Sequence, residues 1–333
     1  MFKVGFTQQA LTDPERSDWS GQGLRPLNCS LWYPAEDGAD DALVLLPPND
    51  PVMVLGRVAV DAAVLASDKE LPVVLLSHGT GGAASGLGWL AGHLAAEGYV
   101  VIGVDHHGNT AVEPYRAEGF LCWWERARDL TVALDALSVE GPLAGRLNLV
   151  RVGAAGFSLG GYTALALAGA VTEMTRFRDW AEGQEGGGGP RGFPDLTDHV
   201  APLLETSAMF RESWQRQSES YRDARVKRVL TLAPAPPVRG FTPESLGAID
   251  FPVAIVAGGT DREAPADPCA RWLHSLLSGS RLDVLGPDVG HYAFLCEGTA
   301  RGRKLDPDVW DDPPGVDRRQ VHDQVCAIAS QAL

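Results

Sequence analysis

The sequence predicts an α/β fold in which helices cover both faces of a mostly parallel central sheet, and two observations carry this prediction. From residue 72 onward, short apolar runs alternate with segments whose apolar residues recur at helical spacing. Those runs are also apolar at nearly every position, as strands buried on both faces are. With 333 residues, 45% of them hydrophobic, the chain can bury a large core, and we expect one domain over residues 1–333.

The expected elements follow one another in a regular order. Strands are expected at residues 72–78, 99–104, 147–157, 226–233, 252–258 and 281–285. Helices are expected between Leu87 and a stop at Gly98, at residues 124–139, from the third strand through Ala170, and around Val321, Val325 and Ile328. Residues 1–71 lack this alternation and are expected to be irregular and antiparallel, with strand candidates at 31–33 and 52–65.

Two polar segments interrupt the pattern. Residues 171–224 contain the glycine run 186–189, and we interpret them as a helical lid inserted into the domain, with a mobile glycine tip; a fixed structural cap is the alternative. The apolar residues at helical spacing in this insertion are Val200, Leu203, Leu204, Met209, Phe210 and Trp214. Residues 296–316 are rich in Pro and Asp and are expected to form a long surface loop.

The charge balance is strongly acidic and excludes some classes of function. Asp and Glu number 43 against 28 Lys and Arg, which gives a formal net charge of −15. Such a surface repels nucleic-acid phosphates and anionic lipid, so no nucleic-acid partner is expected. No apolar run approaches the ~18 residues of a membrane span, and the first residues do not resemble a signal peptide. We therefore expect a cytoplasmic protein with no integral membrane segment.

The sharpest motif is the Gly-x-Ser-x-Gly pattern at residues 156–160, which a further glycine, Gly161, follows. An apolar strand precedes it and a helix-forming run follows it. In this context the pattern predicts a strand that turns abruptly into a helix, with the serine exposed at the apex. The flanking glycines leave room for the close approach of strand and helix. Ser158 is therefore the predicted nucleophile.

A serine nucleophile needs a base, and on such a turn the acid and the base follow the serine in that order along the chain. Four histidines follow Ser158. His199 lies in the insertion, and His274 and His322 lie within expected helices. His291 lies in a loop just after the last expected strand, where a side chain can reach the nucleophile, and is the predicted base.

The acid that orients the base is expected after a strand between Ser158 and His291. The fourth strand leads into a Pro- and Ala-rich segment without a carboxylate, whereas the fifth leads directly to Asp261. Asp261 is the predicted acid, with Glu263 and Asp288 as fallbacks. The alternative role for Asp261 is to cap the helical run that follows it.

Two backbone N–H groups are expected to bind the oxyanion. One belongs to Leu159, the residue after the nucleophile, and the other belongs to the glycine-rich segment 77–82 after the first strand. Thr80 is the predicted donor there, with Gly79 second. His78 more often bonds the loop backbone than acts as a catalyst.

No metal site is expected. Residues 105–108, Asp-His-His-Gly, end the second strand, but no second ligand cluster accompanies them, so they more plausibly form a structural network near the site. The five cysteines are scattered and contain no Cys-x-x-Cys pair, which favours neither zinc binding nor a disulfide framework.

Taken together, these pieces resemble an α/β-hydrolase and, more narrowly, the platelet-activating-factor acetylhydrolase-like group often labelled predicted dienelactone hydrolases. The matching segments span most of the chain and lie at 32–35, 77–81, 104–109, 156–161, 257–265 and 290–295. The resemblance implies an esterase without a cofactor and maps its nucleophile, acid and base onto Ser158, Asp261 and His291. Two departures stand out. Dienelactone hydrolases use a cysteine nucleophile, and the acid of the acetylhydrolase relatives follows an earlier strand, where this chain has Pro and Ala.

The sequence thus predicts a serine hydrolase that cleaves a small-molecule carboxylic ester through an acyl-enzyme. The alternatives are an amidase, thioesterase or acyltransferase with the same triad, or a non-catalytic binding module of this fold. Trp89, Phe157 and Tyr292 are the predicted substrate-binding residues, although aromatic side chains more often pack in the core. The particular ester and the oligomeric state stay open.

Overall fold

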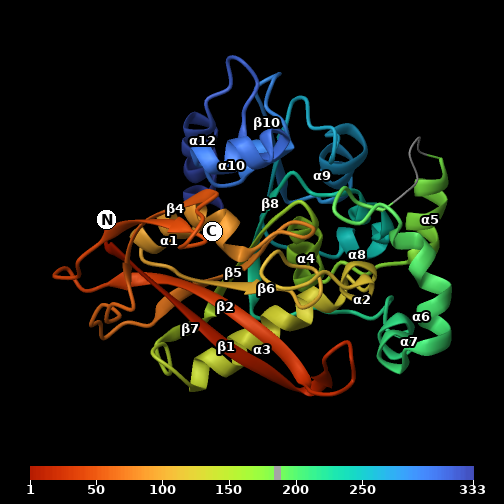
Figure 1. Cartoon of the computed structure of the whole chain (residues 1–333), viewed down its shortest axis with the longest axis horizontal. Coiled ribbons are helices and arrows are strands. Elements are labelled where there is room, and N and C mark those ends of the chain that lie inside the picture. Colours follow the sequence, from red (N-terminus) through yellow and green to blue (C-terminus); the bar gives the residue numbers. More distant parts are fainter. Residues whose placement is uncertain (184–188) are drawn as a thin grey trace.

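The computed structural model describes residues 1–183 and 189–333. Within them, ten strands form one sheet in the spatial order β10-β9-β8-β7-β5-β6-β2-β1-β4-β3, with helices on both sides (Figure 1). The strands are β1 (Lys3–Ser17), β2 (Leu24–Ala35), β3 (Ala42–Leu46), β4 (Met53–Val60), β5 (Leu71–Ser77), β6 (Val100–Asp105), β7 (Leu147–Phe157), β8 (Val226–Leu232), β9 (Val253–Gly258) and β10 (Ser280–Leu285).

The strands from β5 to β10 form the parallel part of the sheet. Every pair of spatial neighbours from β10 to β6 runs parallel. In β5, β6 and β9 nearly every side chain is buried, because helices cover both faces. All of these strands lie where the sequence predicts them, and the mostly parallel α/β architecture is confirmed.

Two hydrophobic cores lie on opposite faces of the sheet, because successive side chains of a strand point to opposite faces. In β5, Val73 and Leu75 face the core under α3 and α4, whereas Val74 and Leu76 face the core under α1 and α12. The helices are α1 (Gly88–Ala96), α2 (Ala117–Leu121), α3 (Glu125–Val139), α4 (Leu159–Ala168), α5 (Met174–Glu182), α6 (Val200–Thr206), α7 (Ala208–Gln215), α8 (Pro243–Gly247), α9 (Trp272–Leu276), α10 (Ala300–Leu305), α11 (Pro307–Trp310) and α12 (Arg318–Ala332).

The N-terminal region is more regular than the sequence suggests. β1 and β2 form a long antiparallel hairpin, and β2 joins the parallel strands by pairing antiparallel with β6. β1 was not predicted from the sequence because many of its side chains are polar and exposed, so that no apolar run marks it.

The predicted surface loop at 296–316 is wrong in part, because it contains the short helices α10 and α11. The hydroxyl of Thr299 accepts a hydrogen bond from the Gly302 N–H and caps α10, and Pro307 begins α11. Both helices are mostly exposed, so their polar sequence carries no helical periodicity of apolar residues.

The insertion at 171–224 contains α5, α6 and α7 and lies at one side of the sheet (Figure 1). The predicted glycine tip falls largely outside the described residues, which resume at Gly189. Beyond the tip, the ring of Trp214 lies 5.7 Å from that of Trp124 at the start of α3, and Phe210 is completely buried beside it. This end of the insertion therefore packs into the core of the domain.

Candidate active site

The turn at Ser158 is strained in the way that the glycine-flanked motif predicts. β7 ends at Phe157 and α4 begins at Leu159, and Ser158 between them has φ 56° and ψ −117°, a region that a non-glycine residue seldom occupies. A Cβ atom on Gly156 would lie 2.0 Å from the carbonyl oxygen of Gly160. Only glycine allows the strand and the helix to approach so closely.

His291 and Asp261 lie beside this turn and complete a continuous chain of contacts. His291 begins a short 3₁₀ helix (His291–Phe294) after β10, and Asp261 lies just after β9. The Nε2 atom of His291 lies 3.0 Å from Oγ of Ser158, and its Nδ1 atom lies 2.7 Å from Oδ2 of Asp261. All three side chains are at least 93% buried, with exposures of 6–7%. The structure thus brings the three predicted residues together.

The contacts also fix the direction of each hydrogen bond. A carboxylate oxygen accepts, so the short contact to Asp261 places the proton on Nδ1 of His291. Nε2 then accepts from the Ser158 hydroxyl, which is the arrangement that a general base requires. The other oxygen of Asp261 accepts a hydrogen bond from the Ala264 N–H at 2.7 Å. The helical run that follows begins only at Asp267 and has no side-chain cap, so Asp261 does not fill the capping role considered as its alternative. The fallback acids Glu263 and Asp288 are both exposed.

The segment 78–82, called the oxyanion loop after its predicted role, lies against the turn. A Cβ atom on Gly79 would lie 3.2 Å from the Cβ of Ser158. The N–H of Gly81 donates to Asn109 and that of Gly82 donates to Gly79 O. Within the described chain, the N–H groups of Gly79, Thr80 and Leu159 have no acceptor. These include the two predicted oxyanion donors.

The three predicted substrate-binding aromatics fall into two places. The rings of Phe157 and Tyr292 lie 4.7 and 5.3 Å from the ring of His291. Trp89 instead stacks on His322 of α12 at 3.9 Å and donates from its indole N–H to the Phe294 carbonyl. Neither of these two contacts involves Ser158, His291 or Asp261. Both are packing contacts.

A cluster of aromatic side chains that was not predicted from the sequence also lies beside the oxyanion loop. Tyr115 donates a hydrogen bond from its hydroxyl to the Gly81 carbonyl, and its ring lies 4.9 Å from that of Phe120. Phe193 of the insertion extends the group, 5.3 Å from Phe120. These residues lie in segments without regular periodicity, and only the tertiary fold gathers them.

The Asp-His-His-Gly segment forms polar contacts, as the sequence suggests. Asp105 accepts a hydrogen bond from the Ala84 N–H at 2.8 Å, and burial raises the pKa of its carboxyl to about 6. His106 contacts Ser77 and Asp129, and His107 contacts Glu113. Among the described residues, no group of three or more His, Cys, Asp or Glu side chains could hold a metal ion. No helix in the described residues is both long and apolar enough to cross a membrane.

Arg126 and Asp129, which belong to the same polar contacts, were not predicted from the sequence. A signal for them does exist. Arg126 and Asp129 lie four positions before Leu130 and Ala133, which are buried on α3, so both occupy the face that should be apolar. Both are 2% exposed. Charged residues on a buried helix face require partners, which here are Ser77 and His78 for Arg126 and His106 for Asp129.

Comparisons with known proteins agree with this architecture. The chain superposes on a ferulic acid esterase from Streptomyces cinnamoneus with a TM-score of 0.64 and 20% identity, covering 100% of this chain and 90% of that one. This match shows the fold: the chain has the α/β-hydrolase fold, as the sequence resemblance implied. A model of a family described as PET hydrolase-like matches residues 63–183, which include the oxyanion loop and Ser158. No curated protein matches the chain.

Proposed function

We propose that the chain is a serine hydrolase that cleaves carboxylic esters. The observation that carries this proposal is the hydrogen-bonded chain from Ser158 through His291 to Asp261. The N–H groups of Thr80 and Leu159, which have no acceptor among the described residues, support it as candidate oxyanion donors. The similarity to a PET hydrolase-like family and to an esterase of the same fold supports an ester as the substrate. A small-molecule ester substrate and a cytoplasmic location remain predictions.

In the proposed mechanism, Oγ of Ser158 attacks the ester carbonyl carbon while Nε2 of His291 takes the hydroxyl proton. The carbonyl oxygen becomes an oxyanion, which accepts hydrogen bonds from the N–H groups of Thr80 and Leu159. Collapse of this intermediate breaks the bond to the alcohol oxygen, which leaves with the proton from His291. Water then attacks the acyl-enzyme with His291 again as base, and release of the acid restores Ser158. Asp261 holds the imidazole throughout.

The same groups would serve an amidase, a thioesterase or an acyltransferase, and a binding module would need none of them. Labelling with a fluorophosphonate, together with hydrolysis of p-nitrophenyl esters of rising acyl length, tests the proposal. Wild type should label and hydrolyse, and Ser158→Ala should do neither while its Tm changes by only a few degrees. Replacement of the exposed Ser275 by Ala serves as the control. Undiminished hydrolysis by Ser158→Ala would rule out the assigned nucleophile.

We further infer that residues 189–199 of the insertion narrow the mouth of the site. Arg191 forms a bidentate ion pair with Asp306 at 2.8 and 2.9 Å and approaches Tyr292, the neighbour of His291. Gly192 lies against Tyr115, whose hydroxyl contacts the oxyanion loop. The insertion is thereby joined to both sides of the triad.

Substituting the ion pair tests this role. Arg191→Ala should change the ratio of kcat/KM for a long and a short acyl ester, with unchanged Tm, because exposed ion pairs contribute at most about 1 kcal/mol to stability. The exposed Arg178→Ala in the same insertion is the matched control. An unchanged ratio in Arg191→Ala would leave the insertion as a structural cap.

A further inference from the structure

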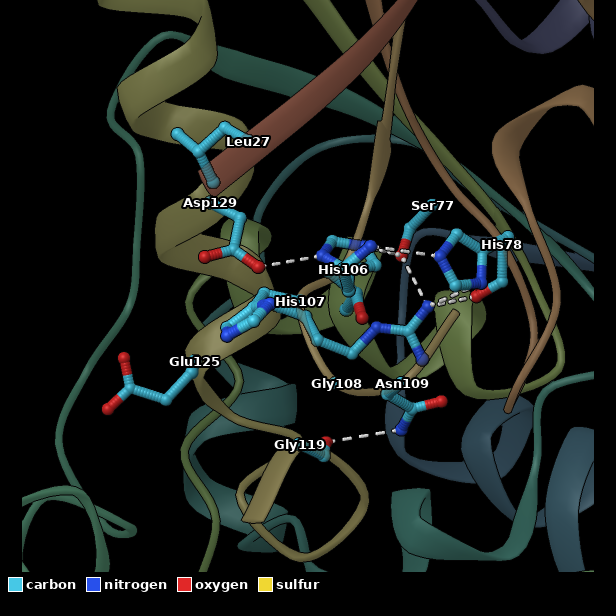
Figure 2. A network of polar contacts seen from close by, with 12 residues as sticks. Leu27, Ser77, His78, His106, His107, Gly108, Asn109, Gly119, Glu125 and Asp129 are labelled. Carbon is cyan, nitrogen blue, oxygen red and sulfur yellow. Dashed lines mark hydrogen bonds and ion pairs between the residues drawn. The ribbon is translucent and has the colours of Figure 1, made fainter. Parts of the chain in front are cut away.

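A second Ser-His-Asp arrangement lies inside the domain (Figure 2). Oγ of Ser77 lies 2.9 Å from Nε2 of His106, and Nδ1 of His106 lies 2.9 Å from Oδ2 of Asp129. The three side chains are 0–2% exposed, so no substrate reaches them. Their place in the chain suggests another role, since Ser77 ends β5 immediately before the oxyanion loop.

The hydrogen bonds fix the tautomers of the two buried histidines. Burial and the neighbouring Arg126 lower the pKa of His106 to about 4, although Asp129 opposes them, and burial also holds the pKa of His78 well below 6.5. Neutral His106 donates from Nδ1 to Asp129, so its Nε2 accepts from the Ser77 hydroxyl. The backbone N–H of His106 donates to Nε2 of His78 at 3.1 Å, which leaves the proton of His78 on Nδ1.

That proton is directed at the oxyanion loop. Nδ1 of His78 lies 2.6 Å from the carbonyl oxygen of Gly79 and donates to it. In a planar trans peptide, the C=O of one residue and the N–H of the next point in opposite directions. Holding the Gly79 carbonyl toward His78 therefore turns the Thr80 N–H to the opposite side, where none of the described residues provides an acceptor.

Arg126 fixes the preceding peptide unit in the same way. Its Nη2 group donates to the His78 carbonyl and lies 3.4 Å from Oγ of Ser77. This carbonyl shares a peptide unit with the Gly79 N–H. Burial lowers the pKa of the Arg126 guanidinium to about 9, and the negative charge of Asp129 opposes this shift. Arg16 in turn holds the other oxygen of Asp129 at 2.5 Å.

We propose that His78, Arg126, Ser77, His106 and Asp129 form a positioning network for the oxyanion hole. The network holds the carbonyls of His78 and Gly79 inward, so that the Thr80 N–H is oriented before substrate binds. Donors that are already oriented stabilise a developing oxyanion without reorganisation during the reaction. This inference rests on the proposed esterase function and adds residues that act only through the loop backbone.

Two substitutions at His78 separate positioning from general structural support. In His78→Asn, the side-chain nitrogen lies as far from Cβ as Nδ1 does, so the donor to Gly79 O can be kept while the acceptor for the His106 N–H is lost. In His78→Gln, the amide lies one carbon further out, so the acceptor can be kept while the donor to Gly79 O is lost. Each variant thus loses one buried hydrogen bond, and only one of the two bonds orients Thr80.

We expect kcat/KM for a p-nitrophenyl ester to fall about 10²-fold in His78→Gln and to stay within about tenfold of wild type in His78→Asn, with KM little changed. The matching thionoester provides a second readout, because its sulfur is a weaker hydrogen-bond acceptor than oxygen. His78→Gln should lose markedly less on the thionoester than on the oxoester.

Equal losses in the two variants, or equal losses of His78→Gln on both esters, would overturn the positioning role. If His78→Gln does not fold, Ser77→Ala, which removes one hydroxyl between Arg126 and His106, takes its place in the same comparison of esters. Wild type and Ser158→Ala are measured alongside. Absence of Ser158-dependent hydrolysis in wild type would overturn the proposed function itself, and with it this inference.

Discussion

A Cβ atom on Gly160 would lie 1.9 Å from the carbonyl oxygen of Ser77. The first turn of α4 is thus in direct contact with the end of β5, and this contact holds Ser158, the proposed nucleophile, close to residues 78–82. The second glycine of the motif therefore serves two purposes. It permits the sharp turn after Ser158, and it lets the loop that carries Thr80 approach the nucleophile.

Gly160→Ala should therefore lower both stability and activity, because the added methyl group meets backbone atoms that cannot rotate away. A loss of about 1–3 kcal/mol, or more, is expected from overpacking at such a site. Thermal unfolding and ester hydrolysis measure the two effects. Gly92→Ala in α1 is the control, since nothing lies within 4 Å of its added Cβ, and alanine there should be neutral or slightly stabilising. Wild-type behaviour of Gly160→Ala would contradict the packing described here.

Asp261→Asn should lower kcat by about 10³–10⁴ with little change in KM. An asparagine amide can donate to Nδ1 of His291, which favours the tautomer with the proton on Nε2 and removes the acceptor for Ser158. Steady-state kinetics on one p-nitrophenyl ester measures the effect. Asp288→Asn, which changes an exposed side chain, should match wild type. If instead Asp288→Asn or Glu263→Gln were inactive and Asp261→Asn active, the acid would be misassigned.

The sequence alone is enough to predict that Ser158, Asp261 and His291 lie together, because parallel strands place their carboxyl ends at one edge of the sheet. Each of these residues lies in the segment just after a predicted strand. The position of each residue relative to its strand therefore predicts that the three meet at this edge. Trp89 could not be placed in this way. It lies within a helix, and its stacking on His322 depends on the rotation of α1 against α12, which no local pattern encodes.

The buried network is equally hard to read from the sequence. Arg126 reaches Ser77 and His78 across 49 and 48 residues of chain, and Asp129 reaches His106 across 23. Each contact depends on a rotamer inside the core. The sequence shows only that charges interrupt an apolar helix face. The partners of those charges follow from the packing of α3 over β5 and β6.

The buried histidines should make stability fall with acid. His106 has a pKa of about 4 in the folded chain and an ordinary value near 6.5 when unfolded, so between these values the unfolded chain binds more protons. The free energy of unfolding should therefore decrease as pH falls from 6.5 to 4. His78 and His322, whose pKa values are also lowered, contribute with the same sign.

Denaturant unfolding at several pH values measures this dependence. His106→Gln should reduce the slope by up to about 1.4 kcal/mol per pH unit, the contribution of one proton. Asp105 has the opposite sign, because its pKa is raised to about 6 and protonation stabilises the folded chain. Asp105→Asn should therefore steepen the loss of stability with acid. Identical slopes in wild type and His106→Gln would show that His106 does not govern this range.

We expect one part of the insertion to stabilise the fold and another part to control access of substrate to the site. Phe210 is completely buried, 5.1 Å from the ring of Trp214, and belongs to the core that includes Trp124. Phe210→Ala should lower the free energy of unfolding by roughly 3–5 kcal/mol, and with it the Tm, because the substitution leaves a large cavity in the core. It should leave the ratio of kcat/KM for long and short acyl esters unchanged at temperatures where the variant is folded.

Arg191→Ala should show the reverse, a changed ratio at wild-type Tm, because its ion pair is exposed and lies beside Tyr292. Measuring both properties in both variants decides between the two roles of the insertion. A changed ratio in Phe210→Ala without loss of stability would mean that the packed end of the insertion also shapes the substrate pocket. Loss of stability without a changed ratio in Arg191→Ala would instead make the whole insertion a cap, since its contact with the mouth would then support only the fold.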